Sequence, residues 1–286
     1  MENFDINKDK LLGLMKRLLE DKIVLAFSGG VDSALILKLG SMLRENKDDI
    51  VAIYFKTEAS PKDDLANAKA LAKKMDVKLF VEDISIFDNK TILANPIDRC
   101  YHCKSLLFSK ALQLKEDLGY GHLVDGSNLD DYKVFRPGLR ALDDKKVRSV
   151  LKESNFTKDM VRALAKDLAI SVHKRPSAPC LATRFPYNTP LDISKFDLLD
   201  GGENFIKSLG ITNVRLRVEG DGVRIEVDRE DFPLIFENLE DIKRKLKDLG
   251  FIHLSLDLDG FRSGSMDENL SRKDKEILNP RLKDER

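Results

Sequence analysis

The first half of the chain alternates short β-branched segments with helical patterns, and this alternation restricts the fold more than any other feature. Strands are predicted at 22–27, 50–55, 78–81 and 122–125. Helices are predicted at 8–20, 33–46, 61–75 and 105–118, where apolar residues recur at helical spacing. Strands that alternate with helices of this length are joined by right-handed crossovers, so we expect an α/β domain with a parallel sheet.

The loops between these elements are where function is expected. Ligands of such sheets bind beyond the carboxyl ends of the strands. Three loops follow strands, at 28–33, 57–61 and 125–137, and a longer segment at 88–103 interrupts the pattern. A further helix is predicted at 157–168, and the segment 172–190 after it contains four prolines and cannot be regular. Such a long irregular segment is usually functional or a linker.

Beyond residue 190 the pattern is that of a small α+β unit. Helices are predicted at 193–209 and 231–249, and strands at 214–219, 223–228 and 252–258, with Gly220-Asp221-Gly222 as a hairpin turn. The last 20 residues include 12 charged ones and little apolar periodicity, which favours a solvated tail. We therefore expect a first domain at 1–190, a second at 191–266 and a tail at 267–286.

Charge and composition exclude several classes of protein. The 49 Lys and Arg balance the 49 Asp and Glu, so the chain lacks the general basic field of most nucleic-acid-binding proteins. Hydrophobic residues at 42% describe a folded globular protein rather than a disordered one. No apolar run approaches the roughly 18 residues of a membrane span, and the N-terminus has no signal-peptide core. We expect a cytoplasmic protein without membrane or nucleic-acid partners.

The segment Ser28-Gly29-Gly30-Val31-Asp32-Ser33 follows the first predicted strand and opens a helix. Backbone amides and the positive end of the helix dipole can receive phosphate oxygens there. The glycines permit a tight turn and close approach of the ligand, and the serines add hydroxyl donors. Asp32 would be repelled by phosphate unless Mg²⁺ lies between them. The alternative is a plain strand-to-helix turn that Asp32 and Ser33 merely cap.

The chain contains three cysteines, an odd number that argues against a disulfide framework. Cys100 and Cys103 lie three residues apart at a helix start, and Cys180 follows in the proline-rich segment. Three thiols could hold an iron–sulfur cluster with one open iron, or zinc with His102 or His173 as a fourth ligand. A redox dithiol and unrelated structural cysteines also remain open from these residues alone.

Taken together, several segments resemble two nested groups of enzymes. The loop at 28–33 resembles the SGGxDS pyrophosphate loop of the PP-loop ATPases, whose fold is adenine nucleotide alpha hydrolase-like and which cleave ATP between its α and β phosphates. The segments NPIDRCYHCK, DGSNLDDYKVFRPGLRAL, KDMVRALAKDLAI, RPSAPCLATRFPYNTP and LDLDGFRSGSM resemble the LarE family of ATP-dependent sulfur transferases over residues 8–266. The Walker-type GxxxxGK[ST] motif is absent from the sequence.

This resemblance implies a reaction in the synthesis of the nickel-pincer nucleotide. A carboxylate of pyridinium-3,5-biscarboxylic acid mononucleotide is adenylated by ATP with Mg²⁺, and sulfur then replaces an oxygen to give a thiocarboxylate. In the single-cysteine branch of the family the residue matching Cys180 surrenders its own sulfur and becomes dehydroalanine. The present sequence resembles the three-cysteine branch, in which Cys100, Cys103 and Cys180 hold a [4Fe–4S] cluster that carries a sulfide.

Other polar residues complete the predicted site. Asp125 ends the fourth strand and is expected near the nucleotide with Ser28, Gly29, Gly30, Asp32 and Ser33. Arg184, four residues after Cys180, would bring a cation to a phosphate or to the adenylate, and a surface ion pair is its alternative. Arg215 and Arg217 alternate on one strand face and match arginines that the family uses for the substrate phosphate. A solvated strand face is the alternative for that pair.

Three other functions remain as alternatives. A tRNA thiolase would use the same ATP loop and cysteines, but the zero net charge counts against it. A PP-loop amidotransferase or ligase would not depend on Cys180. A non-catalytic sensor would bind ATP without releasing pyrophosphate. The resemblance also implies a homo-oligomer, a trimer or hexamer, whereas the source of the sulfide is not indicated.

Overall fold

The computed structural model describes residues 2–176 and 179–278 and contains a parallel four-stranded sheet. Its strands are β1 (Ile23–Ala26), β2 (Ile50–Lys56), β3 (Lys78–Asp83) and β4 (His122–Val124). Their order is β3-β2-β1-β4, and every pairing is parallel. The two central strands β1 and β2 are almost fully buried, as expected of apolar strands covered on both faces.

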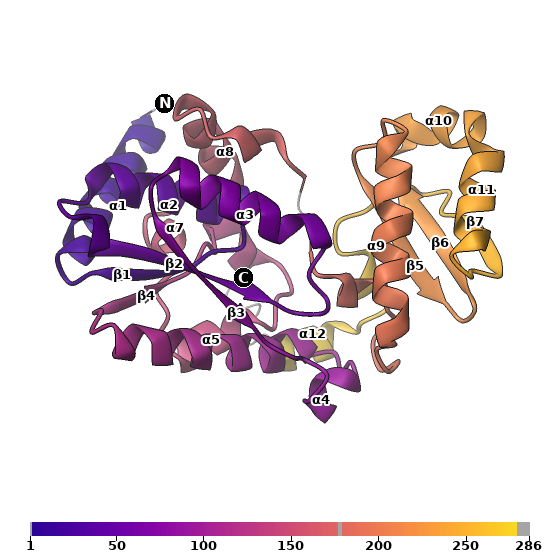
Figure 1. Cartoon of the computed structure of the whole chain (residues 1–286), viewed down its shortest axis with the longest axis horizontal. Coiled ribbons are helices and arrows are strands. Elements are labelled where there is room, and N and C mark those ends of the chain that lie inside the picture. The colour runs from indigo at the N-terminus through magenta and orange to yellow at the C-terminus, as the bar shows by residue number, and fades with distance from the viewer. Residues whose placement is uncertain (1, 177–178, 279–286) are drawn as a thin grey trace.

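Helices cover both faces of this sheet. On one face α1 (Glu2–Glu20), α2 (Val31–Leu43), α3 (Lys62–Lys74) and α8 (Lys158–Asp167) contribute to one hydrophobic cluster with the β1 residues Ile23 and Leu25. On the other face α5 (Arg99–Asp117) and α6 (Leu139–Asp144) pack against Val24. Figure 1 shows α2 and α3 above the sheet and α5 below it. Two short helices, α4 (Lys90–Leu93) and α7 (Val150–Glu153), lie in the connections.

A second, smaller sheet follows along the chain. The helix α9 (Ile193–Ser208) precedes β5 (Val214–Glu219) and β6 (Gly222–Val227), which form an antiparallel hairpin closed by Gly220 and Asp221. Gly220 has a φ of +59°, which explains a glycine at this turn. Next come α10 (Phe232–Glu237), α11 (Leu239–Asp248) and β7 (His253–Leu256), the last parallel to β6. Figure 1 shows this unit beside the first sheet, so the predicted fold class is confirmed.

Several predicted boundaries were wrong. Helix α1 begins at Glu2 rather than at 8. Helix α5 begins at Arg99 rather than at 105, because Arg99 N–H closes a turn onto the Pro96 carbonyl and starts the helix early. The predicted helix 231–249 is broken at Asn238, whose side chain donates to the Leu234 carbonyl. The expected tail at 267–286 contains the helix α12 (Arg272–Leu278) within its described part.

The segment 172–190 is irregular, as predicted, across its described positions. It holds only two 3₁₀ turns, η3 (Ser171–Lys174) and η4 (Leu181–Arg184), and positions 177–178 lie outside the described residues. Backbone hydrogen bonds fasten it to the first sheet's loops: Leu181 N–H donates to the Ala59 carbonyl, at 2.8 Å. Leu181, Ala182 and Phe185 nevertheless pack in the hydrophobic cluster of the second sheet. This segment therefore contacts both units, and the domain boundary at 190 stays a prediction.

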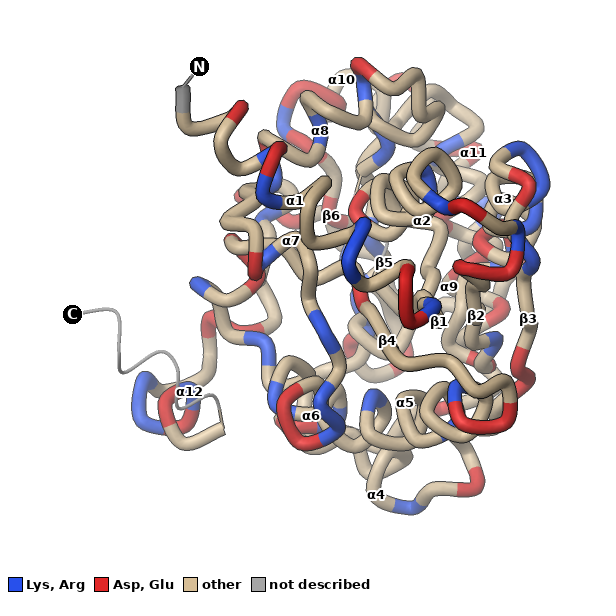
Figure 2. Tube along the Cα trace, turned by 90° about the vertical axis from the view of Figure 1, so that its left-hand side faces the viewer, with Lys and Arg blue, Asp and Glu red and all other residues tan. Residues whose placement is uncertain are grey.

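The surface reflects the balanced charge. Figure 2 shows Lys and Arg interspersed with Asp and Glu along the chain rather than gathered on one face in that view. Among the described helices none is long and apolar enough to cross a membrane.

Candidate active site

The loop at 28–33 connects β1 to α2 and is shaped by its glycines. Gly29 has a φ of +75°, and a Cβ there would lie 3.5 Å from the Ala68 Cβ of α3, so a side chain would be both strained and close-packed. The Ser28 Oγ accepts from Gly30 N–H at 3.4 Å, and the Ser33 hydroxyl donates to the Gly30 carbonyl at 3.2 Å. Helix α2 has no side-chain cap at Gly30. Its N-terminus therefore suits an anionic ligand.

Asp32 stands in a polar network at this helix start. One carboxylate oxygen accepts from the Asn128 amide at 2.9 Å, and the other from the Lys158 ammonium. Asn128 is buried, and its own Oδ1 accepts from the backbone of Asp130 at 2.9 Å and of Asp131 at 3.3 Å. The loop after β4 is thereby folded so that its amide reaches Asp32. Neither Asn128 nor Lys158 was predicted as a site residue.

Asp125 lies at the carboxyl end of β4, beside the loop at 28–33, as the strand-end rule predicts. Its carboxylate is buried and accepts from the Ser149 hydroxyl at 2.6 Å and from both the hydroxyl and the N–H of Ser127. The next residue, Gly126, packs so tightly on α2 that a Cβ would lie 3.0 Å from the Ser33 nitrogen. Asp125 thus ties the loop after β4 to Ser149, Gly126 packs that loop on α2, and a direct contact of Asp125 with nucleotide stays a prediction.

A pocket of about 450 Å³ opens at the carboxyl edge of the sheet, and we call it the sheet-edge pocket. Ser28, Asp32 and Ser33 line one part of it, and Cys180 lines another. The remaining walls come from β2, α3, α5, α8 and the loops after β2 and β4, and they include Lys104, Asp125, Asp131, Arg136 and Lys158. Its volume is within the range of pockets that hold small molecules.

The three cysteines converge near the start of α5. Arg99 is buried and donates to the Ala182 carbonyl at 3.0 Å, to the Asn95 side chain, and to the Cys100 Sγ at 3.5 Å. One guanidinium therefore connects the segment that carries Cys180 with the helix that carries Cys100 and Cys103. This connection brings the start of α5 next to the segment with Cys180, and of the three thiols only Cys180 lines the sheet-edge pocket.

The electrostatics of the thiols are coupled. Burial raises the pKa of Cys103 to about 12, and the negative charges of Cys180 and Cys100 add to the rise. Cys180 is exposed to solvent, yet it lies in a concave wall, where desolvation raises its pKa while Arg99 opposes the rise. A cation bound by all three thiolates would offset this repulsion and stabilise their charged form.

No group of three or more His, Cys, Asp or Glu within the described ranges forms a ready metal site. Three thiols whose charges interact are suitable donors for an iron–sulfur cluster. Their positions in the structure, however, are not those of ligands arranged around a metal. The two candidate fourth ligands for zinc have other partners. His102 pairs with Asp98 at 3.3 Å, and the His173 Nδ1 contacts the Ile170 carbonyl at 2.8 Å.

Arg184 is a buried ion pair rather than a surface one. Its guanidinium is 2% exposed and donates to both carboxylate oxygens of Glu203, at 2.7 and 2.9 Å. It also donates to the Pro179 carbonyl, at 3.3 Å, next to Cys180. Arg184 does not line the sheet-edge pocket. The structure therefore places it behind Cys180, with its charge neutralised, and its predicted catalytic role stays a prediction.

Arg215 and Arg217 are also buried, so the solvated-face alternative is wrong. Arg217 pairs with Glu226 at 2.9 Å and donates to the Thr183 carbonyl at 2.7 Å. Together with Arg184 and Arg224 it lines another pocket, of about 410 Å³. We call this cavity the arginine pocket. Arg215 lies over the Phe261 ring at 5.2 Å, and burial together with the charge of Arg184 lowers its pKa to about 10.

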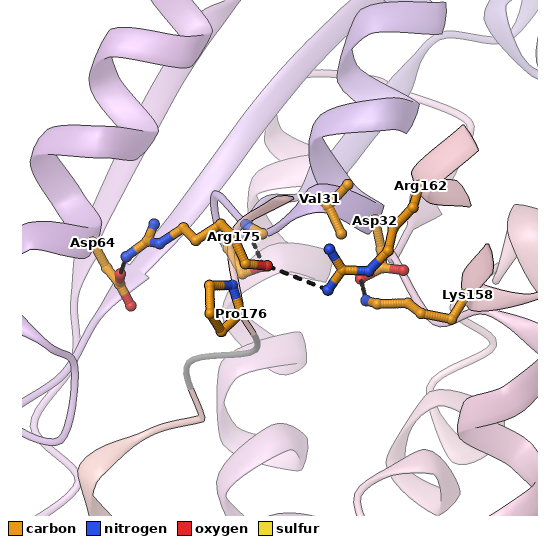
Figure 3. A pocket seen from close by; sticks show the side chains of 9 residues that line it. Val31, Asp32, Asp64, Lys158, Arg162, Arg175 and Pro176 are labelled. Atoms are coloured by element: carbon orange, nitrogen blue, oxygen red, sulfur yellow. Dashed lines mark hydrogen bonds and ion pairs between the residues drawn. The ribbon is translucent and has the colours of Figure 1, made fainter. Parts of the chain in front are cut away.

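A smaller pocket of about 170 Å³ adjoins the loop at 28–33, and we call it the cation pocket. Figure 3 shows Lys158, Arg162 and Arg175 around it. None of these was predicted as a site residue. Lys158 and Arg162 stand four residues apart in KDMVRALAKD, a spacing that puts both on one helix face and could have indicated them.

Comparisons with known proteins agree with this architecture. The family model described as NAD synthase matches residues 7–100, which include β1, the loop at 28–33 and α2. An uncharacterised protein of Synechocystis sp. is 31% identical over 255 residues, 88% of this chain and 94% of that protein. A tRNA-specific 2-thiouridylase of Clostridium perfringens is 22% identical over 192 residues, covering 54% of this chain and 53% of that enzyme.

A further relative matches almost end to end. The pyridinium-3,5-bisthiocarboxylic acid mononucleotide synthase of Lactiplantibacillus plantarum is 30% identical over 275 residues, which is 95% of this chain and 98% of that enzyme. Such coverage includes the ATP loop, the segment with Cys180 and the second sheet. With the loop at 28–33 and Cys180 lining one pocket, the match establishes that the chain is a member of the LarE family of ATP-dependent sulfur transferases.

Proposed function

We propose that this enzyme adenylates a carboxylate of pyridinium-3,5-biscarboxylic acid mononucleotide and converts it to a thiocarboxylate for the nickel-pincer nucleotide. The observation that carries the proposal is the sheet-edge pocket, because Ser28 and Ser33 of the ATP loop and the Cys180 thiol line the same cavity. An acyl-adenylate formed there meets a sulfur nucleophile without leaving the site.

The first step uses the ATP loop. Ser28, Gly29, Gly30, Asp32 and Ser33 bind the phosphates, with Asp32 holding Mg²⁺. A carboxylate oxygen of the substrate attacks the α-phosphorus, the bond from the α-phosphorus to the bridging oxygen breaks, and pyrophosphate leaves with that oxygen. The substrate carboxyl group now carries AMP as a good leaving group, which the sulfur nucleophile displaces.

The second step needs sulfur at the Cys180 end of the pocket. We propose that Cys100, Cys103 and Cys180 hold a [4Fe–4S] cluster, which would supply a sulfide at its open iron. Arg99 supports this assignment, because it connects the two segments that carry the thiols. The chain's own contribution would be to present Cys180 to the pocket and to keep the Arg99 cation beside the thiols.

The substrate mononucleotide has a phosphate that the second unit can recognise. We place it in the arginine pocket, because Arg184, Arg217 and Arg224 line this cavity and guanidinium groups suit phosphate. Arg215 lies two residues earlier on the same face of the strand. Thr183 contacts Arg217 and lies three residues after Cys180, so the arginine pocket and the thiol are close in the chain as well as in space.

Self-association through the second unit completes the proposal. This unit has several exposed apolar side chains: Phe236 is 61% exposed, Ile252 56% and Leu258 77%. Apolar side chains of this size are commonly covered by a protein partner when they lie close together. We expect a homo-oligomer, a trimer or hexamer, in solution, and light scattering measures it.

The test is anaerobic assay of the purified protein with ATP, Mg²⁺ and the pyridinium substrate. Pyrophosphate release together with a thiocarboxylate product supports the function, and ATP binding without pyrophosphate release contradicts it. Asp32→Ala should abolish pyrophosphate release but retain iron, whereas Cys100→Ala should lose iron but retain ATP binding. Loss of both properties in both variants would show that the two roles are not separate.

A second route for the sulfur is favoured by one observation. Cys180 is exposed and lines the pocket, whereas Cys100 and Cys103 are half-buried and outside its lining. If Cys180 surrenders its own sulfur, turnover leaves dehydroalanine and the chain loses about 34 Da. Intact-mass measurement after one turnover distinguishes the routes, because a cluster-carried sulfide leaves the mass of the chain unchanged.

A further inference from the structure

The segment 265–270, near the C-terminal end of the described chain, forms part of the wall of the arginine pocket. Four of its side chains line the cavity: Ser265, Met266, Asn269 and Leu270. The rest of the wall comes from the segment 184–188 and from strands β5 and β6. Helix α12 follows directly and has no buried residue, and Figure 2 shows it at the edge of the molecule.

Side chains, rather than the backbone, fasten this segment to the second sheet. The last backbone hydrogen bond to that sheet runs from Phe261 N–H to the Val227 carbonyl of β6, at 2.8 Å. Among the described residues, the backbone hydrogen bonds of 262–270 stay within that stretch, as from Asp267 N–H to the Gly264 carbonyl at 2.8 Å. The segment can therefore leave the pocket without breaking a strand pairing.

Gly264 provides a pivot for such a movement. Its φ is +82°, a conformation that glycine adopts at little cost. A Cβ at this position would meet only the Asp267 carboxylate, at 3.8 Å, among the described atoms within 4 Å. Hinges consist of a few loop residues that absorb changes of φ and ψ, and no neighbouring element restricts this one.

The segment covers the cation to which we assign the substrate phosphate. Arg217 donates to the Ser265 hydroxyl at 3.1 Å, and the Arg217 side chain is only 11% exposed. Its other partners are the Glu226 carboxylate and the Thr183 carbonyl. A phosphate oxygen that pairs with the N–H held by Ser265 must displace this hydroxyl. The described conformation is therefore closed over Arg217.

A second side-chain contact holds the segment in this closed position. The Tyr187 hydroxyl donates to the Asp267 carboxylate at 2.9 Å, and both residues are half-buried. Burial raises the pKa of Tyr187, and the charge of Asp267 raises it further, so the phenol remains a hydrogen-bond donor at any pH near neutrality. Tyr187 belongs to the irregular segment that carries Cys180. The contact thus joins the segment 265–270 to the neighbourhood of the thiols.

We propose that residues 265–270 form a lid over the arginine pocket, with the hydrogen bond between Tyr187 and Asp267 as its latch. The lid opens about Gly264 to admit the phosphate of the mononucleotide and closes again over it. This inference rests on the proposed binding of the substrate phosphate in the arginine pocket. A closed lid slows the release of the nucleotide while its carboxylate reacts at the other end.

A single fluorescent reporter on the lid tests this movement. The chain contains no tryptophan, so Asn269→Trp places one indole on the lid. All further variants are made in this background, in the full-length protein purified without oxygen. Stopped-flow fluorescence after mixing with the pyridinium mononucleotide, without ATP, gives the association and dissociation rate constants. An unchanged signal in a protein that forms thiocarboxylate would overturn the lid.

Tyr187→Phe removes the latch hydroxyl and keeps the ring. Both rate constants should rise by roughly 3- to 10-fold, the factor that corresponds to one net hydrogen bond, because the latch holds the lid closed in the free and in the bound protein. The affinity then changes by less than about twofold. If Tyr187 only maintains the shape of the pocket, dissociation accelerates without faster association. Unchanged or slower association therefore refutes the latch.

Asp267→Ala removes the same hydrogen bond from the side of the lid. Combined with Tyr187→Phe, it should release the mononucleotide no faster than Tyr187→Phe alone. The latch is already lost in that background, and removal of the Asp267 charge favours a bound phosphate. A further rise of the same size would show that the two residues act separately, which contradicts a latch made by both.

Tyr101 supplies a matched control. Its hydroxyl also donates to a carboxylate at 2.9 Å, that of Asp144, and Tyr101 lines neither the arginine pocket nor the other two cavities described above. Tyr101→Phe should leave both rate constants unchanged. If it accelerates both as much as Tyr187→Phe does, a general loosening of the fold explains the effect and the lid is refuted.

The proposed function and the lid fail separately. Binding of the mononucleotide requires neither ATP nor sulfur. If the rate constants change as described but no thiocarboxylate forms with ATP and a sulfur source, the proposed function fails and the lid stands. If thiocarboxylate forms while Tyr187→Phe binds the mononucleotide at the rates of the background protein, only the lid fails.

Discussion

Replacement of Glu203 by Gln should destabilise the protein more than any replacement of a half-exposed carboxylate. The Glu203 side chain is 2% exposed and accepts both donors of Arg184, as well as the Leu216 N–H at 3.0 Å. The Gln side chain keeps the shape but leaves the Arg184 charge buried and unpaired. Breaking one partner of a buried pair costs about 3–5 kcal/mol.

The chain supplies a control with the same geometry and a different burial. Arg148 and Glu153 also form a two-pronged pair, but their side chains are 37% and 30% exposed. Glu153→Gln should cost about 0–1 kcal/mol, because solvent and salt screen such pairs. Urea denaturation of both variants gives the two free energies of unfolding. Equal costs, or less than about 1 kcal/mol for Glu203→Gln, would refute the argument from burial.

The same pair predicts a dependence on pH. Burial tends to raise the pKa of Glu203, but the hydrogen bonds and charge of Arg184 outweigh it and the net pKa is lowered from 4.5. A carboxyl group with a lowered folded-state pKa stabilises the fold above its ordinary pKa, and that contribution is lost as the pH falls through the folded-state value. The wild type should therefore lose stability below about pH 4.5 more steeply than Glu203→Gln does.

Three further predictions concern packing, the nucleotide loop and the thiols. Gly202→Ala should lower the free energy of unfolding by about 1–3 kcal/mol in urea denaturation, because its Cβ would lie 2.6 Å from the Leu216 side chain. Gly201→Ala is the control: the nearest atom to its Cβ is 4.0 Å away, so it should stabilise α9 by about 0.5–1 kcal/mol. Asp125→Ala should weaken ATP binding by about tenfold in calorimetry, because three donors lose their acceptor; unchanged affinity would contradict this. With a pKa of about 12, Cys103 should be alkylated at pH 8 at least about a hundredfold more slowly than a free cysteine in metal-free protein, as peptide mass spectrometry measures.

Features that depend on neighbours in sequence were predictable. Strand β2 and the loop at 28–33 were placed correctly, because an apolar run and a pair of glycines specify their own backbone. The hairpin at Gly220 was found for the same reason. The start of α5 was missed by six residues, since Pro96 and the turn at Asn95, with a φ of +53°, begin the helix inside a stretch that lacks apolar periodicity.

Features that depend on distant partners were not predictable. Lys158 and Asp32 are 126 residues apart, and Arg175 and Asp64 are 111 apart, so only the fold brings them together. Arg217 illustrates the same limit. Alternation along a strand shows which residues share a face, but not whether another segment covers that face, as Thr183 and Ser265 cover this one.

The position of Cys180 follows from the way its segment is held on two sides. From the first unit, the Ala59 carbonyl receives Leu181 N–H and the Arg99 guanidinium donates to the Ala182 carbonyl. From the second unit, Arg217 donates to the Thr183 carbonyl. Adenylation is proposed on one unit and substrate recognition on the other, so a sulfur that serves both must lie where both units hold the same few residues. A substitution that removes the hydrogen bonds of either unit to this segment should therefore slow sulfur transfer while leaving ATP binding intact.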